Sequence, residues 1–201
     1  RLEFCKNSKE ELKYTLNEFV QTALDEEGYE EGSDGYTKYG SWYGLANADW
    51  CVMFISWCAN QAGIMTTSST GTVPNVPKMA STSAMYTWYT NNRRNLAPSM
   101  SASSPNRLQV GDIVVINTQN GGPVTDHVGI VVSVDYDAGT ADVMEGNRSN
   151  KVKKVTYTNL VDSIGYTIAI FAAITRATNI YDMSGSCIVR AAHNLTATQE
   201  I

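Results

Sequence analysis

Two side chains in this sequence, Cys51 and His127, have types that together can cleave an amide bond. Cys51 follows Asp49-Trp50 at the start of an apolar run that we expect to be a helix, where backbone amides and the helix dipole favour a thiolate. A thiolate needs an imidazole that protonates the departing amine. The chain has two histidines, and His193 lies in a segment without a clear pattern, so His127 is the candidate.

The group that orients the imidazole is expected on a neighbouring strand. We predict a hairpin of residues 127–134 and 141–147, in whose register His127 lies opposite Asn147 or its neighbours. Glu145 is two residues before Asn147, so both side chains point to the same side of the strand. Either one can accept a hydrogen bond from the ring, and the pattern does not decide between them.

Taken singly, each candidate residue also has a more ordinary explanation. A cysteine in a buried apolar helix is commonly an inert core thiol, which is our interpretation of Cys58. A histidine at the start of a strand is commonly structural, and Glu145-Gly146-Asn147 alone is typical of a turn. The catalytic hypothesis therefore depends on the coincidence of these residues in one chain.

Three helices are predicted in the first half of the chain. A capping box at Ser8 begins the first helix, which ends at Gly28. The second is a buried apolar helix from Trp50 to Gln61, with Asp49 as its cap. Pro77 begins a weaker third helix. The Gly- and Tyr-rich segment between the first two helices is interpreted as an ordered loop.

Antiparallel strands are predicted in the second half of the chain. They are expected over residues 113–116, 127–134, 141–145, 151–157 and 166–174. Helices followed by such strands are an α+β pattern in one domain. We assign this domain to residues 8–176. Residues 177–201 are interpreted as a C-terminal tail or linker, because the pattern fades there.

Composition excludes several classes of protein. The 201 residues are 43% hydrophobic, which is typical of a globular domain. Acidic residues outnumber basic ones by 20 to 15, giving a net charge of −5, which argues against sequence-independent nucleic-acid binding. No apolar run is long enough to span a membrane. The chain opens without a charged-then-apolar leader, as expected if a targeting segment was removed or the chain is a piece of a longer protein.

The four cysteines are too few for a disulfide scaffold and lack the Cys-x-x-Cys spacing of a zinc site, so no metal is expected. Cys51 and Cys58 are two helical turns apart, about 10 Å, which is too far for a disulfide. Cys5 and Cys187 are near the two ends. They either form a disulfide in an oxidising compartment or remain unpaired thiols.

The cysteine and histidine segments resemble those of CHAP domains, the cysteine- and histidine-dependent amidohydrolase/peptidase family. The similar segments are YGSWYG (39–44), ADWCVMFISWCANQAG (48–63), LQVGDIVVI (108–116), DHVGIV (126–131) and EGN (145–147). The resemblance covers roughly residues 10–175. It implies a papain-like fold, in which the nucleophile lies at a helix N-terminus that packs against an antiparallel sheet.

The resemblance also implies a function. Such domains cleave peptidoglycan, either within the stem peptide and its cross-bridge or at the muramoyl-L-alanine junction. Cys51 would be the nucleophile and His127 the acid and base. Glu145 would orient His127, and Asn147 would complete the polar set.

Other expectations concern the surroundings of the cysteine. Trp42 and Tyr43 either wall the substrate groove or pin the loop to the core. Some CHAP domains bind calcium in an Asp-rich loop before the cysteine. The corresponding stretch here has only Glu30, Glu31 and Asp34, so no cofactor is expected.

The expected partner is bacterial peptidoglycan, and the expected location is secreted, bound to the cell wall, or delivered there by a phage. Further domains of the same polypeptide, wall-binding or lytic, are expected to supply targeting. Two alternatives remain. One is a catalytically silent wall-binding module on the same scaffold, and the other is a papain-like protease of ordinary proteins.

Overall fold

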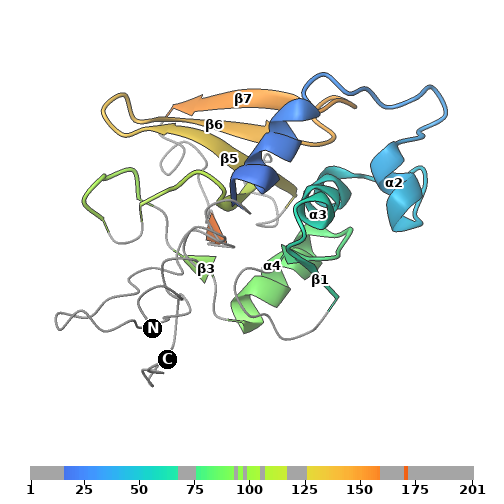
Figure 1. The fold of residues 1–201 in the computed structure, drawn as a ribbon, viewed down its shortest axis with the longest axis horizontal. Helices are drawn as coiled ribbons and strands as arrows, with labels where there is room; N and C mark the ends of the chain where they lie inside the picture. Colours follow the sequence, from blue (N-terminus) through green and yellow to red (C-terminus); the bar gives the residue numbers. More distant parts are fainter. Residues whose placement is uncertain are drawn as a thin grey trace, which may run out of the picture.

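An apolar helix and the antiparallel sheet on which it packs form the centre of the structure (Figure 1). In this computed structural model, the described residues are 16–67, 76–92, 95–96, 99–104, 107–116, 126–158 and 170–171. Helices come first along the chain and the large sheet follows, which confirms the predicted α+β class. The helix α3 (Cys51–Gln61) begins at the cysteine and packs on the sheet, which is the papain-like arrangement that was expected.

The other helices differ in part from those predicted. Residues 16–25 are helical, whereas the start of the predicted first helix lies outside the described residues. The expected loop contains a short helix, α2 (Lys38–Tyr43), whose N-terminus is capped where Thr37 Oγ1 accepts a hydrogen bond from the amide of Gly40. Gly44, with a φ of 93°, ends it in the left-handed region that favours glycine.

Two predicted helix starts are wrong. Asp49 does not cap α3: Trp50 is the N-cap residue and no side chain caps it. Pro77 lies in β2 (Val76–Pro77), which pairs in parallel with β1 (Met65–Thr66). Helix α4 (Thr82–Asn91) begins five residues later, after Ser81. The amides on both sides of Pro77 donate to carbonyls of the β1 segment, so an extended backbone is satisfied there and a helical one is not needed.

The main sheet has six strands in the order β3-β8-β4-β5-β6-β7, and all neighbours are antiparallel. The strands are β3 (Asn95–Leu96), β4 (Ile113–Ile116), β5 (His127–Asp135), β6 (Thr140–Glu145), β7 (Lys153–Thr158) and β8 (Ile170–Phe171). Strands β4 to β7 agree with the prediction to within two residues. Strands β1, β2 and β3 were not predicted, and most of the predicted segment 166–174 lies outside the described residues.

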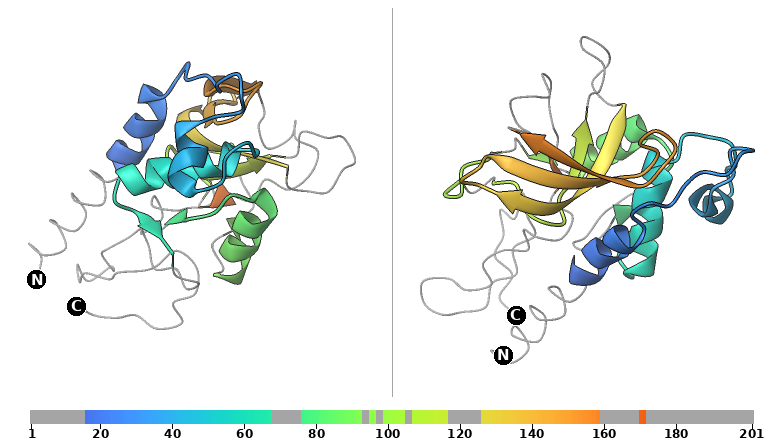
Figure 2. Two further views of the ribbon diagram at one scale, coloured as in Figure 1. Left: turned by 90° about the vertical axis from the view of Figure 1, so that its right-hand side faces the viewer. Right: turned by 90° about the horizontal axis from the view of Figure 1, so that it is seen from above.

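The strands β5 and β6 divide their apolar side chains between two clusters. Val128, Ile130 and Met144 belong to the core that contains the buried residues of α3. Val131 and Val143 belong to a second, smaller cluster. Figure 2 shows the helices gathered on one side of the strands. Within the described part of the chain, every helix is too short or too polar to cross a membrane.

A buried serine of α3 ties this helix to the chain that leads into α4. Ser56 is fully buried, and its Oγ accepts a hydrogen bond from the amide of Met79 at 3.0 Å. The same hydroxyl is within donating distance of the carbonyls of Pro77, at 3.1 Å, and Met79, at 3.0 Å. This contact therefore fixes the segment before α4 against α3.

We expect Ser56→Ala to lower the free energy of unfolding by about 1–3 kcal/mol, because the amide of Met79 loses its acceptor. Urea denaturation measures this change. The control is Ser41→Ala, at an exposed position of α2, which should change stability by less than about 0.5 kcal/mol. Equal unfolding curves for the two variants would contradict the role given to Ser56.

Candidate active site

The thiol of Cys51 lies at the N-terminal end of α3, because this residue is the first of the helix. The residue is 6% exposed, and its Sγ is 4.0 Å from Oγ1 of Thr82, the first residue of α4. Cys58 is fully buried, and burial raises the pKa of its thiol well above the usual value. The two cysteines are both free thiols. They thus differ in environment: the thiol of Cys58 is fully buried, whereas that of Cys51 is near the hydroxyl of Thr82 and is slightly exposed.

His127 begins β5 and lies between the cysteine and a carboxylate. Its Nε2 is 2.9 Å from Oε2 of Glu145, the last residue of β6. The side chain of Cys51 interacts with the ring closely enough to raise the pKa of His127. Because Nε2 faces Glu145, Nδ1 is the ring nitrogen left for another partner. Thiol, ring and carboxylate therefore form one interacting series.

The charge state of this ring depends on its two partners. Burial by itself lowers the pKa of His127, because a buried imidazolium loses hydration. Hydrogen bonds and charge interactions with Cys51 and with Glu145 outweigh burial and raise the pKa to about 9. His127 therefore carries a proton at neutral pH, which is the state that can stabilise a thiolate and protonate an amine.

Two glycines allow the elements that carry these residues to approach closely. In the sequence they were recognised only as parts of the similar motifs. A Cβ on Gly129 would lie 2.3 Å from Cγ1 of Val143 and 3.1 Å from Cγ of Glu145. A side chain at position 129 would therefore collide with Val143 and crowd the side chain of Glu145. A Cβ on Gly146 would lie 2.6 Å from Cβ of Phe54 in α3, so the turn after β6 is in direct contact with the helix that carries Cys51.

Asn147 contacts a different partner from the one expected. Its Nδ2 donates to Oδ1 of Asp49 at 3.0 Å, whereas Nε2 of the ring is hydrogen-bonded to Glu145. Asn147 has a left-handed φ of 57°, which turns the chain sharply after β6. The carboxylate of Asp49, which does not cap α3, is held by this bond instead. The bond connects the turn to the residue two positions before Cys51, and a role of Asn147 in catalysis stays a prediction.

Trp42 and Tyr43 form the C-terminal end of α2. Both are half-buried, and their rings meet edge to face with centroids 6.4 Å apart. The ammonium group of Lys78 lies 4.7 Å from the centroid of Trp42 and 5.3 Å from that of Tyr43. Tyr43 also packs against the main core. The packing accounts for part of their role, and contact with a substrate stays a prediction.

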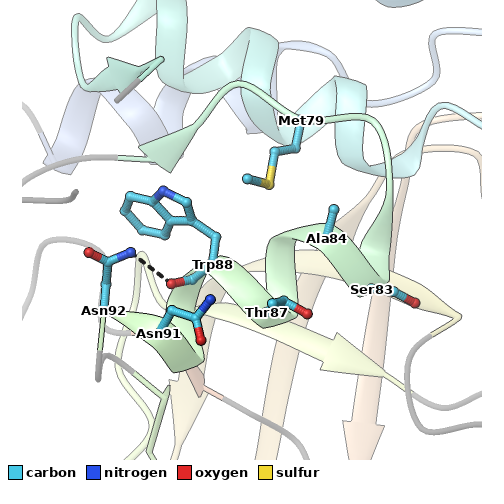
Figure 3. Close-up of a pocket in the computed structure, with 7 residues that line it drawn as sticks. All are labelled: Met79, Ser83, Ala84, Thr87, Trp88, Asn91 and Asn92. Carbon is cyan, nitrogen blue, oxygen red and sulfur yellow. Dashed lines mark hydrogen bonds between the residues drawn. The ribbon is translucent and has the colours of Figure 1, made fainter. Parts of the chain in front are cut away.

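Two cavities are lined by residues that are near Cys51 or its neighbour Thr82 in the sequence. One, of about 440 Å³, follows α4 from the residue next to Thr82 (Figure 3). It is lined by Met79, Ser83, Ala84, Thr87, Trp88, Asn91 and Asn92. The other, of about 490 Å³, includes Asp49 and Asn147 and is lined by Glu31, Gly35, Asn47, Ala48, Asp49, Asn147 and Asn150. In the described residues, no three His, Cys, Asp or Glu side chains gather as metal ligands would.

Comparison with known proteins agrees with this geometry. The family model of the CHAP domain matches residues 42–147, which is more than half of the chain and includes Cys51, His127 and Glu145. The chain belongs to the CHAP family. This match confirms the predicted resemblance. CHAP domains are a family of cell-wall hydrolases. No curated protein sequence matches this CHAP domain.

One solved structure resembles the chain distantly. It is the crystal structure of a "similar to lipoprotein" protein of the NLP/P60 family from Staphylococcus aureus subsp. aureus Mu50. The TM-score is 0.41 at 16% identity, and the match covers 78% of this chain and 41% of that one. The present chain thus spans less than half of that protein.

We expect Gly146→Ala to slow the reaction of Cys51 with iodoacetamide, because the added methyl group pushes the turn away from Phe54 and moves Glu145. Such overpacking also lowers stability by about 1–3 kcal/mol. The control is Gly63→Ala, which strains a backbone with φ of 72° but meets no atom within 4 Å. Peptide mapping by mass spectrometry gives the rate at Cys51. Equal rates in the wild type and Gly146→Ala would show that this contact does not position the site.

The raised pKa of His127 predicts how stability depends on pH. A group whose pKa is higher in the folded state stabilises the fold fully below its unfolded pKa, near 6.5, and loses this contribution as pH rises to about 9. We therefore expect the free energy of unfolding of the wild type, relative to His127→Gln, to fall across this range. Urea denaturation at several pH values tests it, and a difference independent of pH would be the contrary result.

Proposed function

We propose that this CHAP domain hydrolyses an amide bond of bacterial peptidoglycan, with Cys51 as nucleophile and His127 as acid and base. Glu145 would orient the ring of His127. The observation that carries this proposal is the series of thiol, imidazole and buried carboxylate at the start of α3: the imidazole lies 2.9 Å from the carboxylate, and its pKa is raised by the thiol. A family of cell-wall hydrolases supplies the class of substrate.

In the first half of the reaction, the sulfur of Cys51 attacks the carbonyl carbon of the amide, and its proton resides on His127. The backbone amide of Cys51 is oriented at the helix N-terminus, where it can donate to the oxyanion that forms. The C–N bond then breaks, and His127 gives its proton to the leaving amine. The product of this half is a thioester on Cys51.

In the second half, water attacks the thioester carbon and His127 accepts a proton from it. The C–S bond breaks, releasing the carboxylic acid and restoring the thiolate and imidazolium. The side chain of Glu145 stays opposite the ring throughout, so that it orients the imidazole in both halves of the reaction.

The two cavities support binding of an extended substrate rather than a small one. The cavity along α4 offers Met79 and Trp88 to apolar groups such as alanine methyl groups. The other cavity offers Glu31, Asp49 and amide side chains to polar and cationic groups. Trp42 and Tyr43 remain candidates for contact with the glycan or peptide. We assign the catalytic domain to residues 8–176 and expect secretion, or delivery by a phage, to bring it to the wall.

An acidic domain is not attracted to a wall that carries anionic polymers. We therefore propose that further modules of the same polypeptide supply wall binding or a second lytic activity. Addition of a separate wall-binding protein domain to this chain should increase its rate on whole walls more than its rate on soluble wall fragments.

We expect Cys51→Ala to abolish release of soluble fragments from purified walls, with a loss of at least about a thousandfold. The matched control is Cys58→Ala, which removes a thiol from the same helix and should retain the activity. The silent-module alternative predicts binding to walls without release by the wild type. Release by Cys51→Ala equal to that by the wild type would contradict the proposed nucleophile.

The products of the reaction identify which bond is cut. We expect mass spectrometry of fragments from a defined peptidoglycan to show one new amino terminus. A new terminus at L-alanine beside free muramic acid identifies an amidase, and one within the peptide or cross-bridge identifies an endopeptidase. Casein incubated in parallel should remain intact, because degradation of casein would favour a protease of ordinary proteins.

A further inference from the structure

The carboxylate of Glu145 has a second close partner besides the histidine. Glu145 is fully buried. Its Oε2 faces His127, and its Oε1 accepts a hydrogen bond from the hydroxyl of Tyr157 at 2.5 Å. Both oxygens of a buried carboxylate are thus engaged, as they must be for the charge to persist away from water.

We propose that Tyr157 is a positioning residue, whose hydroxyl holds the Glu145 carboxylate in the orientation that keeps His127 turned toward Cys51. This inference rests on the proposed function. Tyr157 lies on β7, outside residues 42–147 that match the family model, so the family motif does not include it.

The contribution of Tyr157 follows from how a carboxylate can move. The group of Glu145 is free to rotate about its last carbon–carbon bond unless both oxygens are held. Tyr157 holds Oε1 from the neighbouring strand, and Oε2 is thereby directed at the ring. Burial and the adjacent Glu145 raise the pKa of Tyr157, so its hydroxyl stays protonated and can donate at every pH where the site works.

One other charged group approaches this carboxylate. Arg148 Nε is 3.6 Å from Oε2 of Glu145, and the arginine side chain is 39% exposed. That distance is too long for a good hydrogen bond, and water screens the charge. Among the described residues, three titratable or charged groups face the ring and its carboxylate: Cys51 from α3, Tyr157 from β7 and Arg148 from the turn after β6. Of these, only Tyr157 fixes Oε1.

We expect Tyr157→Phe to move the basic limb of the Cys51 reaction with iodoacetate to lower pH and to lower the maximal rate several-fold. The anionic reagent is attracted by the imidazolium, so the rate falls when His127 loses its proton. In the wild type this loss is expected near pH 9. In the variant the carboxylate turns away from the ring, and the proton is lost earlier. Peptide mapping over a range of pH values gives the rate at Cys51.

The matched control is Tyr136→Phe. The hydroxyl of Tyr136 donates to the carbonyl of Leu108 at 2.5 Å, so this variant loses an equally short tyrosine hydrogen bond without touching Glu145. Its iodoacetate profile should coincide with that of the wild type. Circular dichroism verifies that both variants are folded.

A double-mutant cycle tests whether Tyr157 acts through the carboxylate. In a Glu145→Gln background, Tyr157→Phe should leave the position of the basic limb unchanged. The inference is overturned if the iodoacetate pH profile of Tyr157→Phe coincides with that of Tyr136→Phe. It is also overturned if Tyr157→Phe shifts the basic limb as much in the Glu145→Gln background as in the wild type. A wild-type Cys51 that reacts no faster than Cys58 would instead overturn the proposed function, so the two failures are distinguishable.

Discussion

The contact between helix α3 and the turn after β6 is the constraint on which the candidate site depends. Gly146 allows this turn to approach Phe54 so closely that no Cβ would fit. The Asn147–Asp49 hydrogen bond fastens the same turn to the chain just before the helix. One side of this contact carries the thiol and the other carries the carboxylate. The contact therefore sets the distance that the imidazole ring has to bridge.

Burial disfavours the charged form of the His127 ring, and interactions with Cys51 and Glu145 offset this cost. Burial disfavours a charged imidazole, and a fully buried carboxylate is unfavourable without donors. Together the two groups neutralise one another, and the hydroxyl of Tyr157 satisfies the remaining oxygen. A buried ion pair of this kind contributes little net stability. Its effect is to hold the His127 ring in one orientation and in its protonated form near the sulfur of Cys51. A thiol hydrolase needs both.

The sequence predicted the local parts of this site well. Alternation of apolar residues identified β5 and β6, and the hairpin register brought Glu145 or Asn147 to His127. The strand pattern could not choose between the two, because both point to the same side. The choice depends on the turn: with its left-handed backbone, Asn147 reaches back to Asp49 and leaves the ring to Glu145.

Long-range contacts account for what the sequence could not predict. Asp49 has the residue type of a helix cap, but a partner 98 positions away takes its carboxylate. Pro77 has the residue type of a helix start, but β1 offers its neighbours hydrogen bonds. The sequence does not distinguish a glycine required by a close approach from one required by a turn, so the role of Gly146 could not be predicted. Tyr157 likewise occupies an ordinary alternating position of β7.

The most direct measurement of the central interaction is an NMR titration of the His127 ring in the wild type and in Cys51→Ala, with the signal assigned through its loss in His127→Gln. We expect the ring of the wild type to keep its proton until about pH 9 and the pKa to fall in Cys51→Ala, because the thiol is one of the two partners that raise it. A ring that titrates near 6.5 in both proteins would mean that sulfur and imidazole do not interact, and the proposed hydrolase mechanism would be wrong.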